Sequence, residues 1–533
     1  MATTARRSLL LVLTLMPGCT AWWPEIEDAC DGCTTTGDLP PQDSGPIQTA
    51  TGPEAGATTG DEGGSSTGFV QQDPALGEVA VTPAVLEASG PVTVTAKAEH
   101  AEGVRMQLGD AVVELVEAEP GEFVGEIAVF SGLSNGPHEV TLTPWRADLE
   151  GDSKTAQYFI SLPEPGSLGF WEATGLLGEG QAGAVAALPG TDEFVEAGTL
   201  LVGGEPRCYL RRRAKGGAWS DSDVLHVLPD EECSVTDLAV DHDGIHLLAE
   251  REVAGVSRWW LGRMAFWGAE VEHRGYGVVG EEATALASRP GKLAVCGTKQ
   301  QDKDTDAFAS IFTADQVGAP LTPFDYVPVG NDDHTVNERV TDCVFNEDTL
   351  VLGGAALGQH DLGKGDFVER DRGFLLEFDT VSGSFAWRVA PQGPGAETQS
   401  AVTALAVDDE KRLIAGVYTC EDVCAPAAEL RGYLPGGELF WQTDLPEVLP
   451  PEALAWSPAG YLVAASALPR GPFWTAFWLQ AWRPSLDAPL WTFIRDDAPS
   501  LQMARTVAIG SFGLILAVGA GEGNVPAVAI VHG

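Results

Sequence analysis

Residues 402–418 read VTALAVDDEKRLIAGVY: an apolar hexamer, a polar turn and a second apolar run that contains small residues. This pattern predicts a β-hairpin, because short apolar runs on either side of a turn are typical of paired strands. Just upstream, residues 373–389 read GFLLEFDTVSGSFAWRV and predict a second strand pair that ends near Trp387. Together the two stretches predict one unit of four short strands.

The same unit recurs along the second part of the chain. Its hexamers are separated by 53, 48, 57, 62, 49 and 53 residues and begin at Ala182, Val235, Ala283, Val340, Val402, Pro451 and Ala504. Aromatic residues mark the fourth strand of most units, at Trp219, Trp267, Tyr326, Trp387, Trp441 and Trp491. A repeat of about fifty residues with four strands is typical of a β-propeller blade, which buries both faces only against its neighbours. Seven hexamers therefore predict seven blades.

The two ends of the repeat array complement each other. After the last hairpin only VPAVAIVHG remains, so the last unit lacks a fourth strand. Phe170 and Trp171 precede the first hexamer much as Phe440 and Trp441 precede the sixth. We therefore expect residues 166–173 to pair with the C-terminal strand and close the ring, which removes exposed sheet edges.

Several segments of the unit resemble a known repeat family. Residues 306–312 (DAFASIF), 373–378 (GFLLEF) and 402–416 resemble the β-propeller repeat of secreted and lipid-anchored bacterial proteins. Residues 379–387 (DTVSGSFAW) are similar to the tryptophan-docking repeat of quinoprotein-like propellers. The resemblance covers residues 166–533 and implies a scaffold without specifying an activity. Quinoprotein enzymes use eight such repeats and adjacent cysteines, which this chain lacks, so we expect no quinone cofactor.

The N-terminus has the features of an export signal. Arg6 and Arg7 precede an apolar run, residues 8–16, that is too short to span a bilayer as a helix. The run ends in LMPGC, which resembles a bacterial lipobox, so residues 1–19 are predicted to be a signal peptide and Cys19 to be lipidated. The alternative is ordinary cleavage after Ala21. We expect an extracytoplasmic protein, either an outer-membrane or cell-surface lipoprotein or a secreted protein.

Two further regions separate this signal from the repeats. Residues 20–74 are rich in Thr, Gly, Pro, Ser and acidic residues and predict a disordered linker. Residues 75–163 change to short alternating runs between turn signals, which predict about seven strands and an Ig-like β-sandwich. Residues 121–148 within it resemble bacterial Ig-like modules. The predicted fold is therefore all-β, with a disordered linker, an Ig-like sandwich and a seven-bladed propeller over residues 166–533.

The charge of the chain excludes several classes of partner. It has 31 Lys and Arg residues against 77 Asp and Glu residues, a net charge of −46. Nucleic acids and anionic lipid surfaces both require a basic face. We expect no nucleic-acid partner, membrane contact only through the lipid anchor, and a monomer.

Cysteine placement fits an oxidising compartment. Cys208 and Cys233 are a candidate disulfide between strands of one blade, and Cys420 and Cys424 are a second candidate across a short loop. Cys296 and Cys343 occupy strand positions that are apolar in other repeats. We predict that these two are buried thiols.

Few side chains have the spacing of a metal site. His242 and His246 lie four residues apart but flank a predicted hairpin turn, which favours a solvated turn. Asp302, Asp304 and Asp306 alternate as in a calcium loop, but the glycine and glutamate of that loop are missing. A charged loop is therefore favoured over a Ca²⁺ site, and no cofactor or metal is expected.

Long polar loops cluster in the third to fifth units and predict a binding face. Its candidate residues are Asp302, Asp304, Asp306, Asp332, Asp333, His334, His360 and Asp361. Loop length that drifts without function is the open alternative.

The predicted function is a non-enzymatic binding or scaffold module for an unknown protein or glycan of the cell envelope. The alternative is an extracytoplasmic hydrolase or lyase that uses the central channel of the propeller. Such chemistry requires paired carboxylates, and the channel is expected to have only one acid and one base beside four threonines, which disfavours this alternative. The side chains expected to point into that channel are the second residues of the hexamers, Thr236, Thr284, Thr341, Thr403, Glu452 and Arg505.

Overall fold

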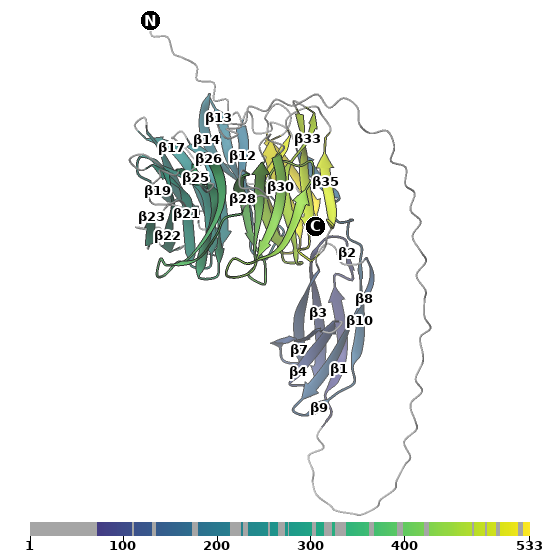
Figure 1. Ribbon diagram of the computed structural model, residues 1–533. Helices are drawn as coiled ribbons and strands as arrows, with labels where there is room; N and C mark the ends of the chain where they lie inside the picture. The colour runs from purple at the N-terminus through teal and green to yellow at the C-terminus, as the bar shows by residue number, and fades with distance from the viewer. Residues whose placement is uncertain are drawn as a thin grey trace, which may run out of the picture.

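The computed structural model describes most of the chain after residue 71. The described residues are 72–108, 111–129, 135–172, 180–213, 225–227, 233–242, 244–253, 256–264, 272–275, 277–300, 305–313, 322–325, 337–361, 367–391, 398–420, 426–471, 474–485, 488–496, 502–520 and 526–533. Their regular elements are all β-strands, which confirms the all-β prediction (Figure 1). Across these ranges no helix is long and apolar enough to cross a membrane.

The first ten strands form two sheets that share one core. The strands are β1 (Ala75–Thr82), β2 (Val85–Leu86), β3 (Gly90–Glu99), β4 (Gly103–Leu108), β5 (Ala111–Glu114), β6 (Val116–Glu119), β7 (Glu122–Val129), β8 (Gly136–Arg146), β9 (Leu149–Glu150) and β10 (Lys154–Ile160). One sheet has the order β1-β3-β7-β6 and the other β2-β10-β8-β4-β5, with β9 beside β8. Buried and exposed residues alternate along β3, as expected of a strand with one face in the core. The core contains Val92, Val94, Val104 and Leu142.

Seven four-stranded antiparallel sheets follow, six of them built from consecutive strands. The first three are β12 (Gly180–Ala187), β13 (Phe194–Val202), β14 (Glu205–Arg213) and β15 (Leu225–Val227); β16 (Cys233–Asp241), β17 (Gly244–Val253), β18 (Val256–Met264) and β19 (Glu272–Gly275); and β20 (Glu281–Arg289), β21 (Lys292–Gln300), β22 (Thr305–Thr313) and β23 (Thr322–Asp325).

The next three sheets have the same order. They are β24 (Asn337–Asn346), β25 (Thr349–Asp361), β26 (Phe367–Asp379) and β27 (Phe385–Val389); β28 (Gln399–Val407), β29 (Leu413–Cys420), β30 (Pro426–Tyr433) and β31 (Leu439–Leu445); and β32 (Ala453–Ser457), β33 (Tyr461–Gly471), β34 (Trp474–Trp482) and β35 (Trp491–Arg495).

The seventh sheet combines the two ends of this region. It contains β36 (Met503–Ile509), β37 (Leu514–Ala520), β38 (Pro526–His532) and, as its fourth strand, β11 (Leu168–Glu172). In the register of β11 with β38, Phe170 lies opposite Ile530 and Trp171 opposite Ala529. The strand that precedes the first sheet therefore completes the last one.

Apolar clusters lie between successive sheets and return to the start. Six clusters join each sheet to the next, from the first sheet to the seventh. A seventh cluster joins Ala182, Val185 and Phe194 of the first sheet to Leu516 and Ile530 of the seventh. All of β37 and nearly all of β29 is buried, because both faces of these sheets pack against neighbours. The arrangement is propeller-like (Figure 1).

The aromatic landmarks of the outer strands contribute to these clusters. Trp387, Trp441 and Trp491 are partly buried and pack against the clusters that join the fourth to the fifth, the fifth to the sixth and the sixth to the seventh sheet. Trp219, Trp267 and Tyr326 lie outside the described residues.

Asp192 connects the sandwich to the point where the seventh sheet meets the first. Its Oδ2 accepts a hydrogen bond from Ser89 Oγ of the sandwich at 2.9 Å, and its Oδ1 accepts one from the Phe512 backbone amide of the seventh sheet at 3.0 Å. Asp192 is 3% exposed. A Cβ on Gly510 would lie 2.3 Å from Asp192 Oδ1, so only glycine leaves room for this carboxylate. The sandwich and the seam of the repeat array therefore share one buried acid.

We predict that Asp192→Ala destabilises the protein more than Ser89→Ala does. The first change removes the carboxylate that accepts two hydrogen bonds, one from Ser89 and one from the Phe512 amide, at a cost of about 1–3 kcal/mol. The second removes one donor, which costs about 1 kcal/mol. Thermal unfolding, together with limited proteolysis of the 161–167 connection, measures both effects. Ser153→Ala, which removes an exposed hydrogen bond inside the sandwich, is the control. An unchanged midpoint in Asp192→Ala would contradict the shared role of this acid.

Candidate functional site

A β-bulge recurs in the first strand of six of the seven sheets. The pairing register shifts around the second residue of the hexamer in β12, β16, β20, β24, β28 and β36. A bulge leaves one residue out of the ladder and changes the direction of its side chain. The residues at these bulges are Gly183, Thr236, Thr284, Thr341, Thr403 and Arg505. The bulges therefore contain five of the six residues that the sequence assigned to the channel, whereas Glu452 precedes β32, whose pairing shows no register shift.

Two of these threonines bond to the next sheet. Thr284 Oγ1 donates to the Val340 carbonyl of β24 at 2.9 Å, and Thr341 Oγ1 donates to the Val402 carbonyl of β28 at 2.7 Å. Thr403 Oγ1 donates to the Gly416 carbonyl of its own sheet at 3.3 Å. We call the bonds from Thr284 and Thr341 threonine clamps. The sequence predicted that the hydroxyls of Thr284 and Thr341 point into the channel. Instead, these hydroxyls donate to carbonyls of the neighbouring sheet.

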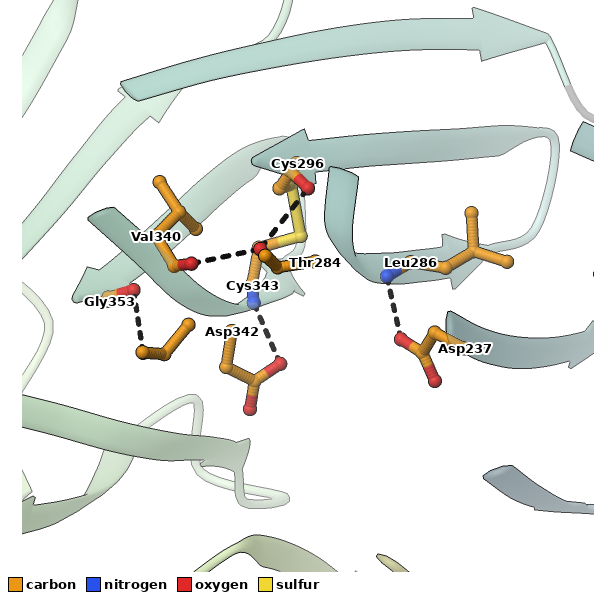
Figure 2. The surroundings of a disulfide bond; sticks show 9 residues. Asp237, Thr284, Leu286, Cys296, Val340, Asp342, Cys343 and Gly353 are labelled. Carbon is orange, nitrogen blue, oxygen red and sulfur yellow. Dashed lines mark hydrogen bonds between the residues drawn. A yellow bond between two sulfur atoms is a disulfide. The ribbon is translucent and has the colours of Figure 1, made fainter. Parts of the chain in front are cut away.

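Two aspartates at the third hexamer position make bonds of the complementary kind. Asp237 Oδ1 accepts from the Leu238 amide and its Oδ2 from the Leu286 amide of β20, both at 2.7 Å. Asp342 of β24 repeats the pattern two sheets later, with the Cys343 amide and the Leu405 amide of β28, again at 2.7 Å. We call these bonds to the next strand the aspartate clamps. In Figure 2 the two carboxylates project to the same side of the inner strands.

Burial raises the pKa of both clamp aspartates. Loss of hydration within the array is the main cause, and it outweighs the backbone amides that favour the charged form. The pKa of Asp237 rises to about 6 and that of Asp342 to about 7, with the charge of Asp237 raising the second further. The two carboxylates therefore titrate near neutral pH and influence each other.

A second pair of ionisable residues lies at the sixth and seventh sheets. Glu452 precedes β32, where its backbone amide donates to the Ala465 carbonyl at 2.9 Å. Loss of hydration raises the pKa of Glu452, and the charge of Arg505 in β36 lowers it. The positive charge of Arg505 therefore favours the ionised form of Glu452.

Both disulfides of the described residues join one sheet to the next. Cys208 of β14 is bonded to Cys233 of β16, with a Cα–Cα distance of 5.3 Å, so this pair bridges two sheets and not strands of one blade. Cys296 of β21 is bonded to Cys343 of β24, with a Cα–Cα distance of 6.4 Å (Figure 2). The prediction of buried thiols at Cys296 and Cys343 was wrong. Both positions are apolar in other repeats because their side chains point toward the neighbouring sheet. The same orientation brings the sulfurs of Cys296 and Cys343 together.

The remaining cysteine candidates are only partly described. Cys420 is buried at the end of β29, while Cys424 lies outside the described residues. The bridge between Cys420 and Cys424 stays a prediction. Cys19, with the whole of the signal and linker up to residue 71, also lies outside the described residues.

The candidate loop residues are distributed differently from the prediction. His360 and Asp361 belong to strand β25, opposite Val368 and Phe367 of β26, and Asp306 belongs to β22, opposite Lys299 of β21. The polar composition of these segments suggested loops, but backbone pairing continues through them. Asp302, Asp304, Asp332, Asp333 and His334 lie outside the described residues.

The two histidines of HDGIH have different environments. His242 is exposed in the turn. His246 is fully buried in β17, and its Nε2 lies 3.3 Å from Asp241 Oδ2. The interpretation of a solvated turn was therefore wrong for His246, because the strand continues into the sheet interior. In the part of the chain that the structure describes, no three His, Cys, Asp or Glu residues are grouped to hold a metal ion.

The aspartate clamps were missed although the sequence contained a signal for them. The hexamers of the second and fourth units read VTDLAV and VTDCVF, whereas most others have alanine at the third position. An acid at a position that is otherwise apolar indicates a specific partner. That partner is the backbone of a neighbouring sheet, which no pattern within one unit identifies.

The chain resembles solved structures only distantly. An ulvan lyase, which is a polysaccharide lyase, aligns with a TM-score of 0.43 at 9% identity over 68% of this chain and 96% of its own. The WD40 domain of Toxoplasma gondii coronin gives 0.41 at 10% identity over 70% and 88%, and Sqt1 of Chaetomium thermophilum gives 0.38 at 12% over 84% and 94%. No protein-family model and no curated protein matches the chain. These neighbours are propeller-like, and at such scores they carry no inference about activity.

The raised pKa values of Asp237 and Asp342 predict that the free energy of unfolding falls as the pH rises toward neutrality. Between about pH 4 and pH 7 the folded protein retains protons on Asp237 and Asp342 that the unfolded chain releases, so this contribution is complete below about pH 4 and lost above about pH 7. We expect the thermal midpoint of Asp342→Asn to change less between pH 5 and pH 8 than that of the wild type.

Thr403→Val is the control for this titration, because it alters the same inner strands without removing an ionisable group. It is expected to keep the wild-type slope of midpoint against pH. A slope in Asp342→Asn as steep as that of the wild type would show that Asp342 does not titrate in this range.

Proposed function

We propose that this protein is an extracytoplasmic binding module, without chemistry of its own, that presents a seven-bladed propeller to a protein or glycan of the cell envelope. Its order along the chain is a lipid anchor at Cys19, a disordered linker, an Ig-like sandwich and the propeller. The seven sheets and the seven apolar clusters between them support the blade number. The two-sheet sandwich with one core supports the Ig-like module.

One observation favours a binding function over an enzymatic function. Four polar groups at the bulges or beside them make bonds between sheets: Thr284, Thr341, Asp237 and Asp342. Such bonds fix the inner strands, as a rigid binding scaffold requires. General acid and base groups instead need their oxygens directed at a substrate.

Inter-sheet disulfides support the extracytoplasmic location. Such bonds persist where the surroundings are oxidising and are rare in the cytosol. Cys208–Cys233 and Cys296–Cys343 are both placed between sheets, where they add to the apolar clusters. An acidic, disulfide-linked propeller on a flexible tether suits a role at or beyond the membrane surface.

We expect Cys19→Ser to move the protein from the membrane fraction to the soluble extracytoplasmic fraction. A lipid chain on this residue is the proposed anchor, and the acidic chain has no basic face to replace it. Fractionation of the producing bacterium with immunodetection of the full chain measures the change, with Cys33→Ser as the matched control. Membrane retention of Cys19→Ser would favour a different anchor.

A second candidate function is a hydrolase or lyase that uses the same inner strands. The raised pKa values of Asp237 and Asp342 favour it, because a carboxyl group that titrates near pH 6 or 7 is suited to proton transfer at neutral pH. In this function one carboxylate would accept a proton from a polysaccharide substrate and the other would remain protonated. The clamps to Leu286 and Leu405 would then serve to hold the two acids.

Binding and turnover distinguish the two functions. The full chain is presented with immobilised envelope polysaccharides and peptidoglycan, and the same samples are followed for new reducing ends and unsaturated sugars. We expect retention on at least one of these polymers without product, and unchanged retention by Asp342→Asn. Product formation by the wild type that is lost in both Asp237→Asn and Asp342→Asn, but kept in Thr403→Val, would establish the enzyme instead.

A further inference from the structure

The edge of the sandwich formed by β5 and β6 is unusual in belonging to both sheets. β5 is the last strand of one sheet and β6 the last strand of the other, and only Leu115 separates them. Residues 111–119 therefore form a nearly continuous extended segment that leaves one sheet and enters the other. Among the described strands none pairs with its outer side.

Leu115 fixes this segment to the sandwich at its midpoint. The residue is 6% exposed and belongs to the sandwich core. Its backbone amide donates to the Val104 carbonyl of β4 at 2.9 Å. A Cβ on Gly125 of β7 would lie 2.3 Å from Leu115 Cδ2, so the glycine makes room for the leucine. The outer edge is thus held in an extended conformation before any partner arrives.

The side chains of this edge are a mixture of apolar and acidic residues, AVVELVEAE, and its register with β7 shifts between Glu117 and Glu119. Every residue of β5 and β6 is exposed, including Val112 at 59%, Val113 at 51% and Val116 at 73%. Exposed valines along an unpaired edge are a template for another strand, and soluble proteins ordinarily block such edges with charge or cover them. Here the charges are Glu114, Glu117 and Glu119, with no lysine or arginine in the segment.

The charge of the segment decides which strand fits. A second copy of the chain would bring three more glutamates and no cation to the same edge, and this accumulation of like charge is unfavourable. The linker preceding β1 is itself acidic. An extended segment that alternates basic and apolar residues would pair its cations with the glutamates and cover the valines.

We propose that the β5–β6 edge, residues 111–119, is a docking site for an extended basic-apolar segment of a partner protein, which adds as a strand to both sheets of the sandwich. Backbone bonds to the edge supply affinity, and the exposed valines and glutamates supply specificity for apolar and basic side chains. This site is independent of the propeller and of its proposed ligand. The sandwich then has a binding role in addition to that of a spacer.

The probe is a labelled peptide that alternates lysine and valine, titrated against the full chain by fluorescence anisotropy. Two control peptides replace valine by glycine, which keeps the charge, or lysine by glutamate, which keeps the apolar side chains. We expect the lysine-valine peptide to bind at least about tenfold more tightly than either control, which corresponds to about 1.4 kcal/mol. Affinity should fall as salt is added.

Paired variants locate the site. Val113→Ser with Val116→Ser should weaken binding at least about tenfold, whereas Val278→Ser with Val381→Ser, which changes two exposed valines of the propeller, should not weaken it. Hydrogen exchange should show new protection of the outward amides of residues 111–119 when the peptide is bound. All these changes are at exposed positions and are expected to leave the fold intact.

Three results would overturn the proposal. Equal binding of the lysine-glycine peptide would show attraction to the net charge alone. A dimer in sedimentation that Val116→Ser dissociates would show that a second copy occupies the edge. Binding that occurs only after residues 1–71 are removed would show that the chain's own N-terminal segment covers it.

Discussion

The hydrogen bonds between neighbouring inner strands are the interactions on which the rest of this fold depends. Each sheet buries both faces, so the sheets need a defined spacing and rotation that apolar packing alone does not specify. The bulges turn Thr284 and Thr341 toward carbonyls in the first strand of the next sheet. Asp237 and Asp342 accept from amides in the first strand of the next sheet. An accepting clamp thus joins the second sheet to the third, a donating clamp joins the third to the fourth, and one clamp of each kind joins the fourth to the fifth.

The aspartate clamps hold neighbouring sheets in one arrangement, and burying the two charged carboxylates for this purpose costs electrostatic free energy. A carboxylate that accepts two backbone amides is well satisfied when charged, yet loss of hydration raises its pKa toward neutrality. A disulfide between Cys296 and Cys343 crosses the same region, and the Cys343 amide is one donor to Asp342. A covalent link and a polar link between sheets therefore meet at Cys343.

The sequence predicted the parts of the fold that depend on periodicity. Recurring hexamers located the inner strands, and the incomplete last unit pointed to residues 166–173 as the strand beside β38. It did not predict contacts between units, because a repeat pattern describes one sheet and not the sheet facing it. The disulfide of Cys296, the clamps of Asp237 and Asp342, and the bond from Ser89 to Asp192 are all contacts of this second kind. The polar composition around His360 and Asp361 also led to a wrong prediction of a loop, because both residues lie in the long strand β25.

The measurement that tests the role of the clamps most directly is the exchange of two backbone amides. Leu286 and Leu405 donate to Asp237 and Asp342, so site-resolved hydrogen exchange should show both amides protected as strongly as the strand core. Asp237→Ala should expose Leu286 and leave Leu405 protected, and Asp342→Ala should do the reverse. If both amides keep their protection in both variants, the carboxylates do not hold the sheets together, and their oxygens are free for a substrate.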